Sequence, residues 1–190
     1  LFFLSMLFTI ASYGQMFTVT TCLGTVGSNT YGPMNSIATA NAVSRTAAIY
    51  PSSQLTGIAG QNLSGAYFSR YGAAGAVMAG SPNFKIYLKQ TTSTDFGTAA
   101  LDWATEIATA TLVYNSDPTA NVGSTVGYKG FPFTTNFLYS GTQNLAVYME
   151  YSNTAAMPAA VTWEYEFQGP CISTANSSTT KYNNNTTGVP

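Results

Sequence analysis

The chain has 190 residues but little charge, with six Lys or Arg, seven Asp or Glu and a net charge of −1. This balance argues against nucleic-acid binding, which needs basic residues gathered on one face, and gives no reason to expect attraction to anionic membrane surfaces. The sequence has no histidine and so lacks the commonest general base and metal ligand, which excludes serine–histidine or cysteine–histidine catalysis and imidazole-bound zinc within it.

The N-terminal segment predicts export. Residues 1–10 (LFFLSMLFTI) form an apolar run, and small or turn-prone residues follow it up to Gln15. This is the pattern of the hydrophobic core and cleavage zone of a secretory signal, and the run is shorter than the roughly 20 apolar residues that span a bilayer. We predict that residues 1–14 are the remnant of a signal peptide and that the chain begins upstream of Leu1. The mature protein is then secreted or at the cell surface, with no membrane insertion.

The mature chain is predicted to form one domain over residues 15–172, because about 175 residues suit a single core. Thirteen Tyr, eleven Phe and two Trp supply the apolar area that such a core needs. Residues 173–190 are rich in Ser, Thr and Asn and poor in apolar residues. They are predicted to be a tail or linker.

Strand signals dominate after residue 15, with β-branched and aromatic runs separated by Gly, Pro, Asn and Ser. A first strand is predicted at residues 16–21, followed by a long surface connection over 23–41. The further predicted strands are 43–50, 63–71, 76–79, 83–90, 111–114, an aromatic pair around a polar bend at 131–139, 144–151 and 161–167. Residues 99–110 are predicted to be a loop or a short helix.

The clearest strand alternates apolar and polar residues, which is the pattern of a half-buried antiparallel strand. Its two faces are Phe84, Ile86 and Leu88 against Lys85, Tyr87 and Lys89. Eight or so short strands at roughly ten-residue spacing predict an all-β fold. We expect an antiparallel β-sandwich, jelly-roll-like.

A succession of motifs covering about residues 43–152 resembles a known module. The motifs are Arg45 with Ile49-Tyr50-Pro51, Phe84–Leu88, Thr94-Asp95-Phe96, Trp103, Leu112–Tyr114, Phe131–Phe133, Phe137–Gly141 and Asn144-Leu145. The module recurs near the N-terminus of large cell-surface and type IX-secreted proteins of Bacteroidetes, which usually have Trp where this chain has Tyr128. The resemblance implies a β-sandwich with a surface or adhesive role and carries over no catalytic residues.

Two cysteines, Cys22 and Cys171, lie near the two ends of the mature domain. An even pair in an exported chain favours a disulfide, and two buried free thiols are the alternative. The bond requires the first and last strands to lie close together. It therefore tests the topology as well.

Aromatic residues outside the predicted core are candidates for ligand binding. Trp103, in a polar segment, is the best candidate for a ring on which a sugar stacks, and a hydrophobic plug at one end of the sandwich is its alternative role. Tyr87 and Tyr148, on the polar faces of their strands, are secondary candidates.

Carboxylates suggest two further kinds of site. Asp95 and Asp102, with Glu106 and Asp117, could supply oxygen ligands to calcium, although their spacing matches no EF-hand; ordinary loop polarity is the alternative. Glu164 and Glu166 share one face of a strand, as a glycosidase pair could; residues that only decorate a solvent-exposed face are the alternative. Two arginines, Arg45 and Arg70, are expected to be structural, pairing with a carboxylate or with carbonyl groups.

These observations favour a non-catalytic exported β-sandwich that serves as a surface-adhesion or structural module. Its expected partner is a glycan or a neighbouring surface protein, and no cofactor is expected except calcium. The alternatives are a carbohydrate-binding accessory module of a secreted polysaccharide-degrading enzyme, a glycosidase, and a self-assembling fibre or surface-layer subunit, which exposed strand edges would permit.

Overall fold

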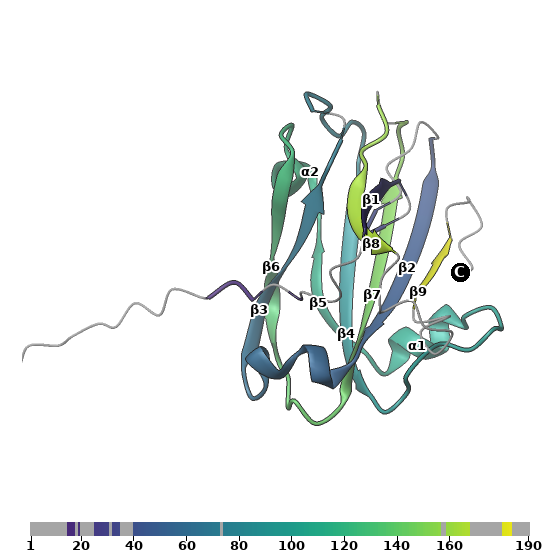
Figure 1. Cartoon of the computed structure of the whole chain (residues 1–190). Coiled ribbons are helices and arrows are strands. Elements are labelled where there is room, and N and C mark those ends of the chain that lie inside the picture. Colours follow the sequence, from purple (N-terminus) through teal and green to yellow (C-terminus); the bar gives the residue numbers. More distant parts are fainter. Residues whose placement is uncertain are drawn as a thin grey trace, which may run out of the picture.

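The computed structural model describes residues 15–17, 19, 25–30, 32–34, 40–72, 74–156, 159–167 and 180–183. The predicted signal segment and both cysteines lie outside these ranges. Two antiparallel sheets pack face to face (Figure 1). Sheet A contains, in spatial order, β1 (Thr25–Asn29), β8 (Trp163–Phe167), β3 (Asn62–Arg70) and β6 (Gly127–Leu138). Sheet B contains β5 (Thr111–Ser116), β4 (Asn83–Thr91), β7 (Asn144–Asn153), β2 (Ala42–Tyr50) and β9 (Thr180–Asn183).

The order of the first eight strands defines the topology. Sheet A runs β1-β8-β3-β6 and sheet B runs β5-β4-β7-β2, with β9 added beside β2. Successive strands thus alternate between the sheets except for β4 and β5, which pair with each other in sheet B, as in a jelly roll built from two Greek keys. The predicted fold class, an antiparallel and jelly-roll-like β-sandwich, is confirmed.

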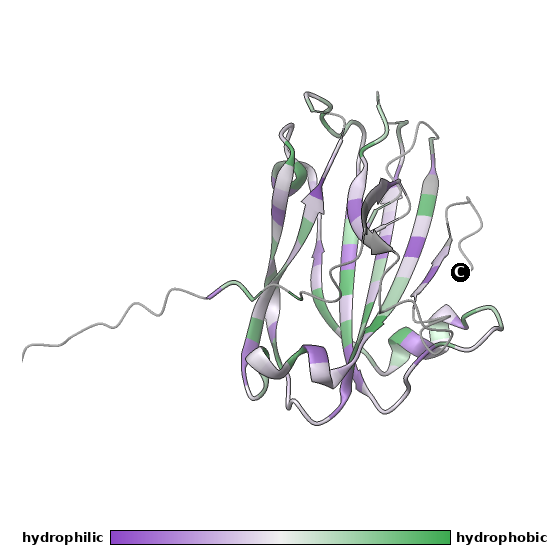
Figure 2. Ribbon diagram, viewed as in Figure 1, coloured by the Kyte–Doolittle hydropathy of each residue, from purple (hydrophilic) through white to green (hydrophobic). Residues whose placement is uncertain are grey.

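The main core lies between the two sheets and is rich in aromatic rings. Phe84 of β4 meets Phe131 of β6 edge-on with ring centroids 5.1 Å apart, and Tyr114 of β5 lies 5.4 Å from Phe131. Such edge-to-face pairs contribute about 0.5–1.5 kcal/mol beyond their buried area. Figure 2 shows the alternation of hydrophobic and hydrophilic residues along β4, and the predicted inward residues Phe84, Ile86 and Leu88 are all buried.

Short helical segments connect the strands. They are the 3-10 helices η1 (Ser52–Gln54) and η2 (Thr56–Ile58) and the helices α1 (Trp103–Ala108) and α2 (Thr119–Val122). Helix α1 falls within the segment predicted to be a loop or short helix. Asp102 caps its N-terminus, because the carboxylate accepts a hydrogen bond from the backbone N–H of Thr105.

The structure corrects several predicted elements. The described residues of the predicted first strand, 16, 17 and 19, are not in a strand, and β1 instead lies inside the predicted connection. The Gly, Ser and Asn residues of β1 have a low strand propensity and therefore predicted a loop. β1 nevertheless pairs along its whole length with β8, because tertiary pairing overrides weak local propensity. Residues 76–79 are likewise outside any strand.

The C-terminal half differs at two places. Residues 131–139 are predicted to be two strands around a polar bend. They belong to a single strand, β6, up to Leu138, but its pairing with β3 is interrupted between Pro132 and Phe137, where the bend is predicted. β6 is the edge strand of sheet A, where its proline is tolerated, and residues 134–136 are exposed. Thr180–Asn183, within the predicted tail, forms β9 against β2.

One arginine holds two connecting segments together, the one between β3 and β4 and the one between β5 and β6. The guanidinium of Arg70 is 1% exposed and donates hydrogen bonds to the backbone carbonyls of Gly72, Ala76, Val122 and Gly123. Burial lowers its pKa. The four carbonyls compensate for the lost hydration of the charge, as buried cations require. The expected structural role of Arg70 is therefore confirmed.

Candidate functional site

The outer face of sheet B gathers charge in a chain that has little of it. Strand register places Arg45 of β2, Glu150 of β7 and Lys85 of β4 in one row across the three central strands. The Glu150 carboxylate accepts hydrogen bonds from Arg45 Nε at 2.8 Å and from Lys85 Nζ at 2.9 Å. The carboxylate expected as the partner of Arg45 is thus Glu150.

A second, smaller apolar cluster covers the neighbouring rows of the same face. Its buried members are Ala47, Ile49, Leu101, Trp103, Ala146 and Tyr148, and Tyr87, Phe96, Ile107 and Ala110 pack against them. The cluster fixes α1 and the segment before it onto sheet B. In this region the sandwich therefore has a third layer.

The three aromatic residues predicted to bind a ligand belong to this cluster. Trp103 meets Tyr148 edge-on with ring centroids 5.8 Å apart, and Arg45 Cζ lies 5.3 Å from the centroid of the Trp103 ring. Trp103 is 5% exposed and Tyr148 only 1%, whereas Tyr87 is half-buried. The expectation of an exposed Trp103 ring is wrong. Its alternative role as a hydrophobic plug is supported, although the plug lies between α1 and sheet B rather than at an end of the sandwich.

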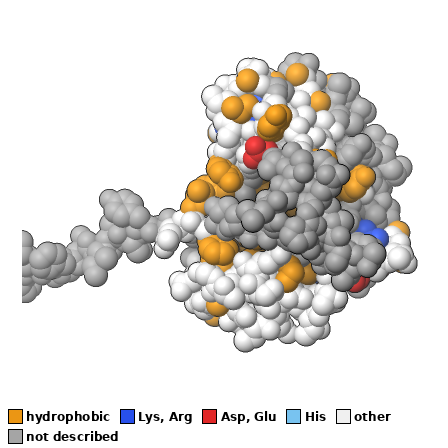
Figure 3. All heavy atoms as spheres, viewed as in Figure 1, with side chains coloured by type: hydrophobic (Ala, Val, Ile, Leu, Met, Phe, Trp, Pro, Cys, Tyr) orange, Lys and Arg blue, Asp and Glu red, His pale blue; other side chains and the backbone are white. Residues whose placement is uncertain are grey.

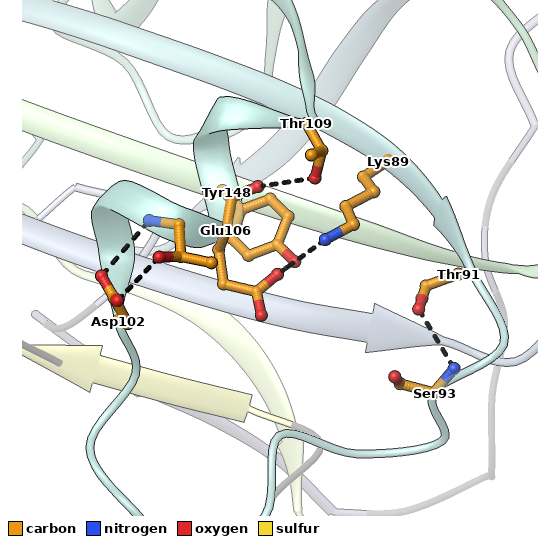
Figure 4. Close-up of polar contacts among 8 residues, drawn as sticks. Lys89, Thr91, Ser93, Asp102, Glu106, Thr109 and Tyr148 are labelled. Carbon is orange, nitrogen blue, oxygen red and sulfur yellow. Dashed lines mark hydrogen bonds and ion pairs between the residues drawn. The ribbon is translucent and has the colours of Figure 1, made fainter.

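Tyr148 nonetheless takes part in a polar contact. Figure 4 shows Tyr148 of β7 and Lys89 of β4 both pointing at the Glu106 carboxylate on α1. Glu106 Oε2 accepts hydrogen bonds from the Tyr148 hydroxyl at 2.5 Å and from Lys89 Nζ at 3.0 Å. Burial, reinforced by the Glu106 carboxylate, raises the pKa of Tyr148, so this phenol remains a hydrogen-bond donor near neutral pH.

Both carboxylates of this face are held in the ionised form. Burial raises the pKa of Glu106, but the hydrogen bonds from Tyr148 and Lys89 outweigh it and leave the pKa below its ordinary value. The pKa of Glu150 is lowered in the same way, since Lys85 and Arg45 outweigh the burial that raises it. Charge-assisted hydrogen bonds of this kind favour the carboxylate over the acid.

A small pocket opens beside the Glu106 contact. Its volume is about 230 Å³, and it lies among the end of β4, the segment after it and α1. The residues that line it are Ile49, Lys89, Thr91, Ser93, Asp95, Phe96, Leu101, Glu106 and Tyr148. The pocket therefore joins one ammonium, two carboxylates and hydroxyl groups, and its accessible lining is mostly polar although buried residues of the apolar cluster form part of its wall.

Three of the predicted calcium ligands, Asp95, Asp102 and Glu106, lie in this region but do not converge, whereas Asp117 follows β5 at the end that pairs with the start of β4. Both oxygens of the Asp102 carboxylate bond to Thr105, one to its backbone N–H at 3.2 Å and one to its hydroxyl at 2.7 Å. Asp95 lines the pocket and accepts a hydrogen bond from the backbone N–H of Gly97. Among the described residues, no group of three or more Asp, Glu, Cys or His side chains could hold a metal ion.

The disulfide stays a prediction, because Cys22 and Cys171 lie outside the described residues. A bond between them requires the first and last strands to lie close together, and these strands do. β1 and β8, the first and last strands of the jelly roll, pair antiparallel with Thr25 opposite Phe167. The chain segments that lead to the two cysteines thus leave this strand pair at the same end.

The pocket also contains residues that the sequence interpretation did not select for it, chiefly Lys89, Ser93 and Phe96. One sequence pattern could have predicted the α1 side of the pocket. If Asp102 is taken as an N-cap, one face of the following helix contains Trp103, Glu106 and Ile107, which have i, i+3, i+4 spacing. That face would be expected to lie on a sheet whose polar side offers Lys89.

Comparisons with family models, with curated proteins and with solved structures found no match to this chain. No helix in the described ranges has the length and apolarity needed to cross a lipid bilayer.

Proposed function

We propose that this protein is a non-catalytic, exported jelly-roll module that acts by binding, in a surface-adhesion or structural role. The observation that carries the proposal is the pocket on sheet B, where polar groups converge around the Glu106 carboxylate, whose pKa is lowered by its hydrogen bonds. Such a site suits recognition. Its partner is a glycan or a neighbouring protein of the cell surface.

The protonation state of the pocket supports binding over hydrolysis. A general acid must carry a proton near neutral pH, so glycosidases raise the pKa of one carboxyl group. Here the pKa of Glu106 is lowered instead, because Lys89 and Tyr148 donate hydrogen bonds to one of its carboxylate oxygens. Glu164, one member of the pair considered for glycoside hydrolysis from the sequence, is exposed on β8.

Export and surface location are supported by the sequence. The apolar run at residues 1–10 has the character of a secretory signal, and the motifs over about residues 43–152 resemble a module of secreted Bacteroidetes surface proteins. We expect the mature chain to begin at Gln15. Mass spectrometry of the N-terminal peptide from the secreted protein checks this cleavage site.

One experiment separates binding from catalysis. The mature chain is applied to immobilised polysaccharides and to outer-surface proteins of the producing cells, and retention and product release are measured in the same wells. Retention without product release is expected. Release of new reducing ends would show an enzyme, and the absence of retention on every surface would contradict the binding role.

A further inference from the structure

Several hydrogen-bonding atoms of the pocket have no partner within the described residues. Glu106 uses Oε2 for both of its bonds, and Figure 4 shows its other carboxylate oxygen pointing away from Lys89 and Tyr148. Asp95 uses one oxygen, for the Gly97 backbone. Ser93 bonds through its backbone groups to Thr91 and Asn144, which leaves its hydroxyl unused.

These atoms and their neighbours define the chemistry of a ligand. Carboxylate oxygens accept hydrogen bonds from hydroxyl groups, the Lys89 ammonium donates to hydroxyl oxygens, and the Ser93 hydroxyl can do either. Phe96 lies in the wall of the pocket against Tyr148, with ring centroids 6.0 Å apart, but the accessible lining is mostly polar. A molecule with several neighbouring hydroxyl groups matches this set.

Other ligand classes fit less well. Two carboxylates beside a single ammonium disfavour an anion, since the net charge of these three groups is negative. The same ammonium opposes a divalent cation, which would also have too few carboxylate ligands here. An apolar molecule would bury the charged lining without compensating it.

We propose that this pocket binds one neutral sugar residue at the end of a glycan chain. The volume of about 230 Å³ lies below the roughly 300–1,000 Å³ of pockets that enclose drug-sized ligands, so one residue enters and the remainder of the chain stays outside. Sugar hydroxyls donate to Glu106 and Asp95 and accept from Lys89. This inference rests on the proposed binding function and names its ligand class.

The test uses the mature chain and a panel of neutral monosaccharides and their oligosaccharides, with binding measured by saturation-transfer NMR and, for the best ligand, by calorimetry. Ser93→Ala removes a hydroxyl that makes no bond within the described residues, and Glu106→Gln removes the pocket carboxylate. We expect affinity to fall at least tenfold in both variants.

Glu150→Gln is the matched control. It makes the same change of carboxylate to amide on the same face, and it also breaks a lysine ion pair, but Glu150 does not line the pocket. Its affinity should stay within twofold of the wild type. Near-ultraviolet circular dichroism of all three variants reports whether the aromatic cluster keeps its packing.

The outcomes distinguish the ligand class from the broader function. Sugar binding that survives both pocket variants would overturn this site and leave the module a glycan binder through another surface. Retention on surface proteins with no binding of any neutral sugar would overturn the ligand class and leave the binding function intact. Loss of affinity in the Glu150→Gln control as well would assign the effect to the fold and contradict the inference.

Discussion

The two outer faces of the sandwich differ in how they are covered. On sheet B, α1 and its preceding segment bury aromatic and aliphatic side chains and enclose two ion-paired carboxylates. On sheet A, Tyr67 of β3 and Tyr128 of β6 alternate with core residues and are 54% and 56% exposed. Charged side chains are few among the described atoms of the face seen in Figure 3.

This difference shows how a charge-poor chain uses its charges. Four of its six cationic residues, Arg45, Lys85, Lys89 and Lys181, lie on the sheet B side, where each bonds to a carboxylate or to a backbone carbonyl. Three of them contact the third layer: Arg45 lies over the Trp103 ring, Lys89 pairs with Glu106 and Lys181 donates to the Ala99 carbonyl. Tyr67 instead lies against Gly130 on the neighbouring strand, where a Cβ atom would approach its ring to 2.7 Å. Side-chain packing on the open face of sheet A therefore depends on the room left at this glycine rather than on charge.

The largest expected effect distinguishes the covered face from the open one. Trp103→Ala should lower the free energy of unfolding by about 3–5 kcal/mol, since it leaves a cavity under α1. Tyr128→Ala, its control on sheet A, should change it by no more than about 0.5 kcal/mol. Urea unfolding followed by circular dichroism measures both. Equal effects would mean that α1 does not cover sheet B as described.

The next effect concerns the strand pair at the edge of sheet A. If Cys22 and Cys171 are bonded, reduction should lower the free energy of unfolding by about 2–5 kcal/mol, because the unfolded chain gains freedom. Denaturant unfolding with and without reductant measures the change. The double variant Cys22→Ser, Cys171→Ser should not respond to reductant. Two thiols titratable in the unfolded, unreduced protein would contradict the bond.

A pH dependence should arise from the central ion pairs of sheet B. The folded pKa of Glu150 lies below its ordinary value of 4.5, so its stabilisation is fully present above that value and is lost as the pH falls through the lowered folded pKa. We expect Glu150→Gln to cost about 1–2 kcal/mol at pH 7 and to flatten the acid side of the stability profile.

The measurement for Glu150→Gln is chemical unfolding at a series of pH values from 7 down to about 2.5, the range in which carboxylates titrate. Glu164→Gln is the control, because Glu164 is exposed and its loss should leave the profile unchanged. If the stability of the wild type and of Glu150→Gln fell equally steeply at acid pH, the pH dependence would not come from Glu150.

The smallest effect isolates the contact between α1 and sheet B. Tyr148→Phe keeps the buried ring and removes only the hydroxyl that donates to Glu106. We expect a cost of about 1 kcal/mol and faster hydrogen exchange confined to α1, since the local opening becomes easier. Unchanged exchange at α1 would contradict this, because it would show that the Lys89 contact and the apolar cluster hold α1 on sheet B without the Tyr148 hydroxyl.

Part of the candidate site was predictable from local pattern. Tyr87 and Lys89 alternate with the core residues of β4, and the position of Asp102 before Trp103 marks a helix start. The sequence offered a buried plug as one role of Trp103 but not the place of the plug, because that depends on Ala47 and Ala146 from strands far apart in sequence. Small side chains on the outer face of sheet B leave the room that the indole ring fills.

The sequence by itself determined the fold class, since two-residue alternation and closely spaced turn residues allow little other than an antiparallel sandwich. It also determined the inward face of β4 and the structural roles of Arg45 and Arg70. Only the tertiary structure decided that β1 and β9 are strands, that β6 is a single strand, and that Glu106 meets Lys89 and Tyr148. Those features depend on partners distant in the chain, whose backbone pairing and charge neutralisation outweigh weak local preferences.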